Sequence, residues 1–313
     1  MTSSPSFLER IRLGDKRALS RLLTQVENDD AEVAPILAEL SSPNRRAYRI
    51  GITGPPGAGK STLAKELVKA YRKSQQTVAV VAVDPTSPFT GGALLGDRIR
   101  MSDVMLDSGV FIRSMATRGS LGGLAAKAAE VSRVLEAAGY DIIIFETVGV
   151  GQSELDIVKA ADTIVVALVP ESGDSVQAMK AGLMEIADVF AMNKADRADS
   201  DKAVQALESS LELRERSVDA WRVPVVKTVA MNGVGISDLR SAIETHRAYL
   251  QSKGLLEKKR QARDQELVER LVEEKWRRAF WTESRREFLA QKLSERLSPY
   301  LVADLLFSND EQT

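Results

Sequence analysis

A glycine-rich stretch at residues 54–62, GPPGAGKST, carries the clearest chemical signal in the sequence. It follows a predicted strand, precedes a predicted amphipathic helix and fits the pattern G-x-x-x-x-G-K-[ST]. Glycines at this spacing let backbone N–H groups surround a phosphate, and the start of the helix adds a partial positive charge. We expect Lys60 to bind the β- and γ-phosphates and the Ser61 hydroxyl to bind Mg²⁺. The predicted nucleotide contacts in this loop are Gly54, Gly57, Ala58, Gly59, Lys60, Ser61 and Thr62.

Acidic residues at the ends of predicted strands suit the metal side of such a site. Glu146 lies at the end of a buried apolar run, and Gly149 comes three residues later. This arrangement is typical of a carboxylate near the metal and of a glycine N–H at the γ-phosphate, so that loss of the phosphate releases the following loop. Asp84 ends another run and Asp97 follows in Gly-Asp-Arg, so both are candidate metal or switch ligands. Aspartate also favours turns, which leaves a structural role open for these two.

An N-K-x-D element at residues 193–196 indicates which base the site prefers. The Asp196 carboxylate can accept hydrogen bonds from guanine N1–H and from the 2-amino group, whereas adenine lacks both donors in that arrangement. The stem of Lys194 can cover the base, and Asn193 can hold neighbouring loops together. Charged hydrogen bonds contribute roughly 1.5–3 kcal/mol each, so two of them favour GTP over ATP by about 10²–10⁴. Ala230 and Met231 follow a later strand and are expected to contact the base through backbone N–H groups.

Seven apolar segments predict the strands that position these residues. Most are near-continuous runs of Val, Ile and Ala, which indicates burial on both faces and hence a parallel sheet covered by helices. Helical patterns alternate with them at 61–73, 121–138, 199–216 and 237–250. The predicted fold class is therefore α/β, a P-loop NTPase whose doubly wound, mostly parallel sheet binds ligand at the carboxyl ends of its strands. The predicted strands are Tyr48–Thr53, Thr77–Asp84, Val110–Met115, Asp141–Thr147, Thr163–Val169, Val189–Asn193 and Val223–Val229.

Helical regions flank this predicted domain on both sides. We expect an N-terminal helical segment at 1–43, the P-loop domain at 44–250 and a C-terminal helical arm at 251–313. After Leu250, large apolar residues recur at helical spacing among many charges, which predicts one or two long amphipathic helices. Both a helical cap on the same chain and an arm used in dimerisation fit this pattern.

The composition excludes several classes of protein. The 313 residues include 43 Lys plus Arg and 44 Asp plus Glu, a formal net charge of −1, which argues against nucleic-acid binding through bulk positive charge. There is no cysteine and one histidine, His246, which excludes disulfides and thiolate zinc sites and disfavours a Ser-His triad. No apolar run reaches the roughly 18–20 residues that span a membrane, and the start lacks the order of a secretory signal. We therefore expect a cytoplasmic protein without nucleic-acid or membrane partners.

These motifs together resemble the MeaB/ArgK-type GTPases, the G-protein chaperones of adenosylcobalamin-dependent methylmalonyl-CoA mutase and related acyl-CoA mutases. The resemblance implies a homodimeric GTPase that binds GTP or GDP with Mg²⁺. It also implies a partner mutase, methylmalonyl-CoA mutase by default. The chaperone would gate the loading of adenosylcobalamin and protect or reactivate this partner, and the cobalamin itself would belong to the mutase. The segments that carry the resemblance are 51–62, 81–101, 113–125, 146–154, 171–182 and 193–196.

The resemblance also implies roles for single residues. Lys60, Glu146 and Asp97 would act in catalysis, and Ser61, Asp84, Asp97 and Glu146 would surround the metal. A segment with Asp174, Gln177 and Lys180 would relay the nucleotide state to the mutase, although a solvated helix start also fits these three.

The group that positions the attacking water is not evident from the sequence. Val150 follows Gly149, where Ras-like proteins carry glutamine, and Gln152 comes three residues after that glycine. Arginines at 98, 100, 113 and 118 are candidates for stabilising charge in the transition state. We therefore expect slow intrinsic hydrolysis that a docked mutase accelerates by ordering these loops.

Two other functions share parts of this pattern. A nickel metallochaperone GTPase would need Cys or His ligands, and the chain has no cysteine and one histidine. An ATP-dependent kinase would need a catalytic base and a site that accepts adenine, which Asp196 disfavours.

Overall fold

The computed structural model describes residues 6–28, 30, 33–40, 46–85, 101–117, 123–147, 159–172, 183–213 and 219–308. The chain divides into two compact units, Met1–Arg260 and Gln261–Thr313. Among the described residues, no helix is both long enough and apolar enough to cross a membrane. The cytoplasmic location stays a prediction.

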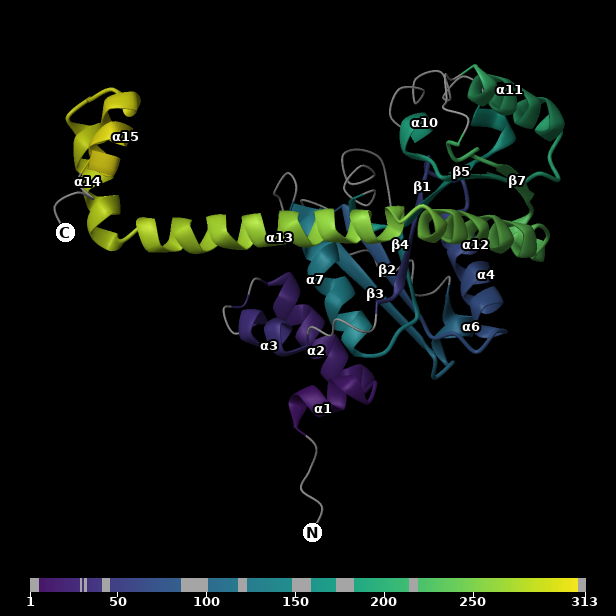
Figure 1. Ribbon diagram of the computed structural model, residues 1–313, viewed down its shortest axis with the longest axis horizontal. Coiled ribbons are helices and arrows are strands. Elements are labelled where there is room, and N and C mark those ends of the chain that lie inside the picture. Colours follow the sequence, from purple (N-terminus) through teal and green to yellow (C-terminus); the bar gives the residue numbers. More distant parts are fainter. Residues whose placement is uncertain are drawn as a thin grey trace, which may run out of the picture. The chain divides into compact units, whose positions relative to one another are not determined.

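The first unit is built on a seven-stranded sheet with the order β3-β2-β4-β1-β5-β6-β7 (Figure 1). Every pair of neighbouring strands is parallel. All residues of β4, β5 and β6 are buried, as expected for strands covered on both faces. The predicted fold class is therefore confirmed. The strands are β1 Tyr48–Thr53, β2 Val78–Pro85, β3 Val110–Thr117, β4 Ile142–Thr147, β5 Thr163–Leu168, β6 Val189–Asn193 and β7 Val225–Thr228.

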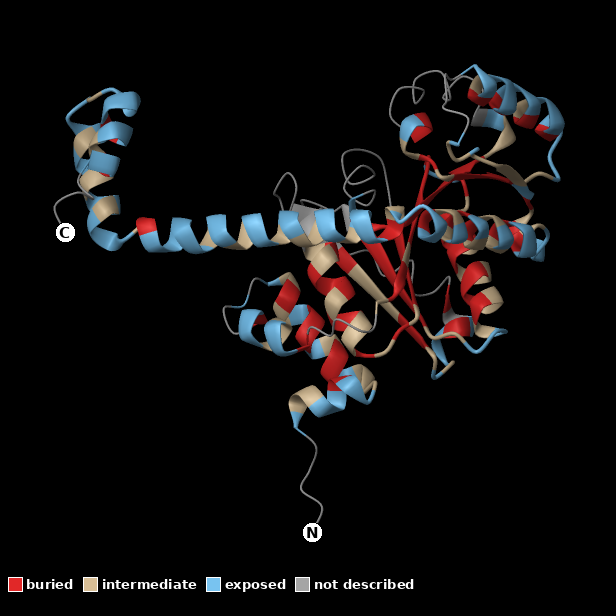
Figure 2. Ribbon diagram, viewed as in Figure 1, coloured by how far each residue is buried: buried red, intermediate tan, exposed pale blue. Residues whose placement is uncertain are grey.

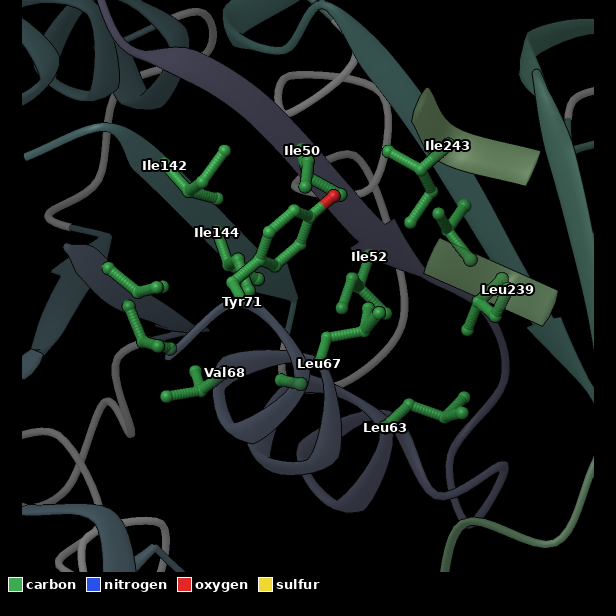
Figure 3. Packing of buried hydrophobic residues seen from close by; sticks show 14 of the residues in the cluster. Ile50, Ile52, Leu63, Leu67, Val68, Tyr71, Ile142, Ile144, Leu239 and Ile243 are labelled. Atoms are coloured by element: carbon green, nitrogen blue, oxygen red, sulfur yellow. The ribbon is translucent and has the colours of Figure 1, made fainter. Parts of the chain in front are cut away.

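One face of the sheet is covered by helices α4 (Lys60–Arg72), α6 (Ser102–Met105) and α12 (Ile236–Ser252). Alternate strand residues such as Ile50 and Ile144 point toward this layer and pack on Leu63, Leu67 and Tyr71 of α4 (Figure 3). Residues of α12, including Leu239 and Ile243, close the same cluster. This packing fixes α4, and therefore the loop before it, against β1.

The opposite face has two coverings. Over β2, β3 and β4, residues such as Ile143 and Phe145 pack against α7 (Gly123–Ala137) and the N-terminal helices. Over β5 and β6, residues such as Val166 and Phe190 pack against α10 (Leu183–Ile186) and α11 (Ser200–Glu212). The N-terminal helices are α1 Phe7–Arg12, α2 Lys16–Glu27 and α3 Val33–Leu40.

Buried polar groups fasten α12 and the start of α13 (Leu255–Phe280) at the amino ends of the strands. Thr163 Oγ1 lies 2.7 Å from His246 Nδ1, and His246 Nε2 lies 3.4 Å from Asp188 Oδ1. Lys259 Nζ donates to the Asp162 carbonyl at 3.1 Å. These contacts all lie at the amino edge of the sheet, so they do not occupy the carboxyl edge, where α/β proteins bind their ligands.

The second unit is helical. The later part of α13 is followed by α14 (Glu283–Ser294) and α15 (Pro299–Ser308), so this region holds more helices than the one or two expected. Its core is small, with Phe280, Val302 and Leu306 buried. Most of its residues are exposed or intermediate in burial (Figure 2).

Candidate nucleotide site

A cavity of about 770 Å³ lies at the carboxyl edge of the sheet. It is lined by the loop after β1, the end of β4, the loop after β6 and the turn after β7. These strands lie on both sides of the central strand β1, where the chain order of the sheet reverses and α/β proteins bind their ligands. The lining residues are Pro56, Gly57, Gly59, Lys60, Ser61, Thr62, Glu146, Thr147, Asn193, Lys194, Asp196, Arg197, Val229, Ala230, Met231 and Asn232.

Two glycines allow the phosphate loop to pass close to its neighbours. Gly54 has φ +132°, and a Cβ there would lie 2.1 Å from the carbonyl oxygen of Ala167 in β5. Gly59 has φ +86°, and a Cβ there would lie 2.3 Å from Asn193 Nδ2. Positive φ and close contact both require glycine at these positions.

The phosphate loop binds the ammonium group of Lys60 through its own carbonyls. It leads into helix α4, whose first N–H groups have no side-chain cap. Lys60 is 7% exposed, and its Nζ donates to the carbonyls of Gly54 at 2.7 Å and Pro55 at 3.1 Å. Gly59 is the N-cap of α4 and has no side chain to bind the first N–H groups of the helix. A helix start of this kind, beside a lysine, favours phosphate.

Ser61 and Glu146 join the phosphate loop to the end of β4. The Ser61 hydroxyl donates a hydrogen bond to Glu146 Oε1, and both residues are buried. Asp84 is the penultimate residue of the neighbouring strand β2, one residue beyond the Val83–Thr147 pair. A hydroxyl and a carboxylate oxygen are donors that Mg²⁺ accepts, so the described residues fit this metal.

On the base side, Asn193 connects three segments. Its Nδ2 donates to the Ala58 carbonyl at 2.8 Å, and its Oδ1 accepts from Ala230 N at 3.1 Å and Thr228 Oγ1 at 3.2 Å. The side chain is 3% exposed. Asn193 therefore holds the phosphate loop, its own loop and the turn after β7 in one arrangement.

The remaining base-side residues are open to the cavity. Met231 is 87% exposed and Asp196 is exposed, and both line the cavity with Lys194. Among the residues that the structure describes, no side chain forms a hydrogen bond or ion pair with the Asp196 carboxylate. An exposed carboxylate and an exposed apolar side chain together suit a planar base with N–H donors at one edge.

The structure thus brings most of the predicted site residues together. Gly54 and Ala58 lie behind the loop and contribute carbonyls that accept from Lys60 and Asn193. The Asp84 side chain is outside the described part of the structure. The other predicted residues outside the described ranges are Asp97, Gly149, Asp174, Gln177 and Lys180, with the arginines at 98, 100 and 118.

Arg113 is not a transition-state candidate. Its guanidinium forms two bonds with Glu27 of α2, at 2.7 and 2.8 Å, and donates to the Ser20 carbonyl at 3.1 Å. The same contacts attach α2 to β3. Because Arg113 is engaged away from the cavity, its role is structural.

Five lining residues were not predicted. Most lie beside the recognised motifs but are not fixed positions of those patterns, so the motif spacing gave no reason to include them. Arg197 follows the N-K-x-D element directly, and this position was the available signal. The five are Pro56, Thr147, Arg197, Val229 and Asn232.

Comparison with known proteins gives consistent relatives. A putative GTPase of Pyrococcus abyssi is 53% identical over 268 residues, which cover 85% of this chain and 82% of that protein. The GTPase ArgK of Escherichia coli is 36% identical over 274 residues, covering 85% and 83%. The mitochondrial methylmalonic aciduria type A homolog of Mus musculus is 37% identical over 270 residues, covering 83% and 64%.

A solved structure and a family model agree with these relatives. The crystal structure of an LAO/AO transport system kinase matches with a TM-score of 0.71 and 29% identity, covering 98% of this chain and 97% of that one. The family model described as methylmalonyl Co-A mutase-associated GTPase MeaB matches residues 19–285. The resemblance inferred from the motifs is confirmed: the chain belongs to the MeaB family, and it is a GTPase.

Proposed function

We propose that this GTPase is a chaperone of an adenosylcobalamin-dependent acyl-CoA mutase, with methylmalonyl-CoA mutase as the default client. It gates the loading of intact adenosylcobalamin and protects or reactivates the mutase. The family description and the name of the mouse relative support the client. The observation that carries the proposal is that the phosphate loop, Glu146 and the N-K-x-D element line one cavity, in a chain of this family.

In this proposal the phosphate side of the cavity binds the triphosphate. Lys60 and the first N–H groups of α4 bind the β- and γ-phosphates. Ser61 and Glu146 hold Mg²⁺, with Asp84 and Asp97 as further ligands, directly or through water. Mg²⁺ held by these residues would neutralise negative charge on the phosphate oxygens. Asp97 and the Gly149 N–H lie in segments that respond to loss of the γ-phosphate.

The base side of the cavity selects guanine. Asp196 accepts from N1–H and from the 2-amino group, and the Lys194 stem covers the base. Ala230 and Met231 contribute backbone N–H groups. Asn193 binds the protein rather than the base, and so keeps the two sides of the site at a fixed separation.

Hydrolysis is slow until the mutase docks. Among the described residues that line the cavity, none is a glutamine that could orient water as in Ras-like proteins. The mutase accelerates the reaction by ordering the loops around the γ-phosphate, and Asp174, Gln177 and Lys180 relay the nucleotide state to it.

The functional form is a homodimer that uses the C-terminal arm. In the second unit, Trp276 is 53% exposed and Phe307 55% exposed, and their rings stack at 5.9 Å. Val272 and Val268, about one and two helical turns before Trp276, are each 59% exposed. An apolar stripe of this kind on a helix favours association with another surface.

Single-turnover GTP hydrolysis with and without the mutase tests the chaperone role. We expect the complex to hydrolyse GTP more than tenfold faster than the GTPase alone, because docking orders the catalytic loops. The matched control is Lys60→Ala with mutase, which should show no acceleration. An equal rate with and without each candidate acyl-CoA mutase would contradict the proposal.

Asp196→Asn tests the base assignment. The variant should bind GDP about 10²-fold more weakly, because a charged hydrogen bond is replaced, and should favour xanthosine diphosphate. Titration calorimetry with GDP, XDP and ADP measures all three affinities. Asp199→Asn is the matched control, since Asp199 is exposed, pairs with Lys202 at 2.8 Å and does not line the cavity. Equal affinity of the wild type for GDP and ADP would refute guanine selection.

A further inference from the structure

An ion pair joins the base-side loop after β6 to the short helix that follows the neighbouring strand β5. Arg197 follows Asp196 and lines the cavity, and its Nη1 donates to Glu171 Oε1 at 2.6 Å. Glu171 lies in the short helix η1 (Pro170–Ser172), which follows β5. Because β5 and β6 are paired, the contact links two loops that leave adjacent strands.

The loop that carries Asp196 has few other restraints within the described residues. Ala195 N donates to the Thr228 carbonyl at 3.0 Å, and Arg197 N donates to the Lys194 carbonyl at 3.0 Å. Lys194 has φ +57°, a left-handed conformation that is uncommon for residues other than glycine. The direction of the Asp196 carboxylate therefore depends on how the loop backbone is held.

Opposite charges on the two side chains stabilise this contact at neutral pH. The hydrogen bond from Arg197 holds the pKa of the Glu171 carboxyl below its ordinary value, and the nearby Lys194 ammonium acts in the same direction. Glu171 is therefore ionised at neutral pH, where Arg197 is also charged.

We propose that Glu171 is a positioning residue for guanine recognition. By holding Arg197, it fixes the loop so that the Asp196 carboxylate meets N1–H and the 2-amino group together. One carboxylate accepts two such bonds well only when distance and direction are both correct. This role rests on the proposed contact between Asp196 and guanine.

The size of the effect follows from the exposure of the pair. The side chains of Arg197 and Glu171 are 47% and 53% exposed. Exposed ion pairs have modest effects and are screened by salt, so we expect losing this one to change guanine discrimination about two- to fivefold.

The test compares GDP with inosine diphosphate, which lacks the 2-amino group. Calorimetry gives both affinities for the wild type, Glu171→Gln, Arg197→Gln and the double variant. The preference for GDP over inosine diphosphate should fall about two- to fivefold in each single variant and no further in the double variant. Asp201→Asn is the matched control, because Asp201 pairs with Lys227 between α11 and β7, and it should leave the preference unchanged.

Other outcomes would overturn the proposal. An unchanged preference in Glu171→Gln, even with a lower melting temperature, would show a structural role only. Wild-type preference in Arg197→Gln and in the double variant, with a loss in Glu171→Gln alone, would show that Glu171 merely keeps Arg197 off Asp196. If the wild type showed no preference for GDP over ADP or inosine diphosphate, the proposed guanine contact of Asp196 would itself be wrong.

Discussion

Single residues of the phosphate loop are constrained by packing as well as by ligand chemistry. Gly54, in this loop, has φ +132°, and a Cβ there would lie 2.1 Å from the Ala167 carbonyl oxygen. Gly14, between α1 and α2, also has a positive φ, of +74°. A Cβ at Gly14 would meet nothing within 4 Å. A side chain at Gly14 would therefore introduce backbone strain without a steric clash, whereas a side chain at Gly54 would introduce both.

Alanine substitution at these glycines gives a prediction for stability. Gly14→Ala should lower the free energy of unfolding by about 1–2 kcal/mol through strain alone. Gly54→Ala should cost more than about 3 kcal/mol, since overpacking adds to the strain. Urea unfolding of both variants without nucleotide measures the difference. Equal losses would show that the β1–β5 contact relaxes freely.

Motif residues of the site could be predicted from sequence because their chemistry dictates their spacing within one segment. Lys60, Ser61 and Asp196 are of this kind. The contact between Glu171 and Arg197 could not, because no pattern relates residues on different strands before the sheet order is known. Arg113 shows the reverse case, since its charge suggested catalysis while its partners lie on α2.

At the scale of elements, the strands were predictable where they are central. The buried strands β4, β5 and β6 are continuous apolar runs, and their predicted positions agree with the structure to within one residue at each end. Strand β7 is shorter than the predicted Val223–Val229. It lies at an edge of the sheet, where Val225 and Val226 are only partly buried, so neighbouring strands do not extend it.

Helix α12 carries a titratable group that predicts the pH dependence of stability. Burial lowers the pKa of His246 to about 3, and the positive charge of Lys259 acts in the same direction, while Asp162 opposes it. Unfolded His246 has a pKa of about 6.5. As pH falls below 6.5, the unfolded chain gains a proton that the folded chain does not take up until about pH 3. Stability should therefore fall by about 1.4 kcal/mol per pH unit in this window from this group.

The variant His246→Gln isolates this contribution. Glutamine keeps a donor and an acceptor near Thr163 and Asp188 but does not titrate. Burial raises the pKa of Asp188, so its own effect has the opposite sign, with stability lost as pH rises, and it is present in both proteins. Urea unfolding at pH 7.5, 6.5 and 5.5 should give a shallower loss for the variant. Identical slopes would show that folding does not lower the pKa of His246.

At the scale of the whole molecule, the first turns of α13 belong to the sheet-bearing unit. Leu256 is 7% exposed and packs in the cluster formed by β1, α4 and α12. Arg260 donates to the Ala47 carbonyl at 3.2 Å and lies 3.7 Å from the buried carboxylate of Asp162. The sequence pattern changes earlier, after Leu250, because charged residues become frequent there. The frequency of charged residues does not reveal that Leu256 and Arg260 contact the rest of the sheet-bearing unit.

These contacts predict where the chain can be shortened. A protein of residues 1–263 should fold and bind GDP within about twofold of the full chain, because its clusters lie within the first unit. A protein of residues 1–254 loses the burial of Leu256, worth about 1.5–3 kcal/mol, and leaves Asp162 buried without Arg260, so it should be several kcal/mol less stable. Urea unfolding and GDP calorimetry measure both effects.

Sedimentation should find the full chain dimeric and residues 1–263 monomeric, since the shorter protein lacks the exposed stripe around Trp276. A dimer of the shorter protein would locate the contact between subunits in the sheet-bearing unit instead.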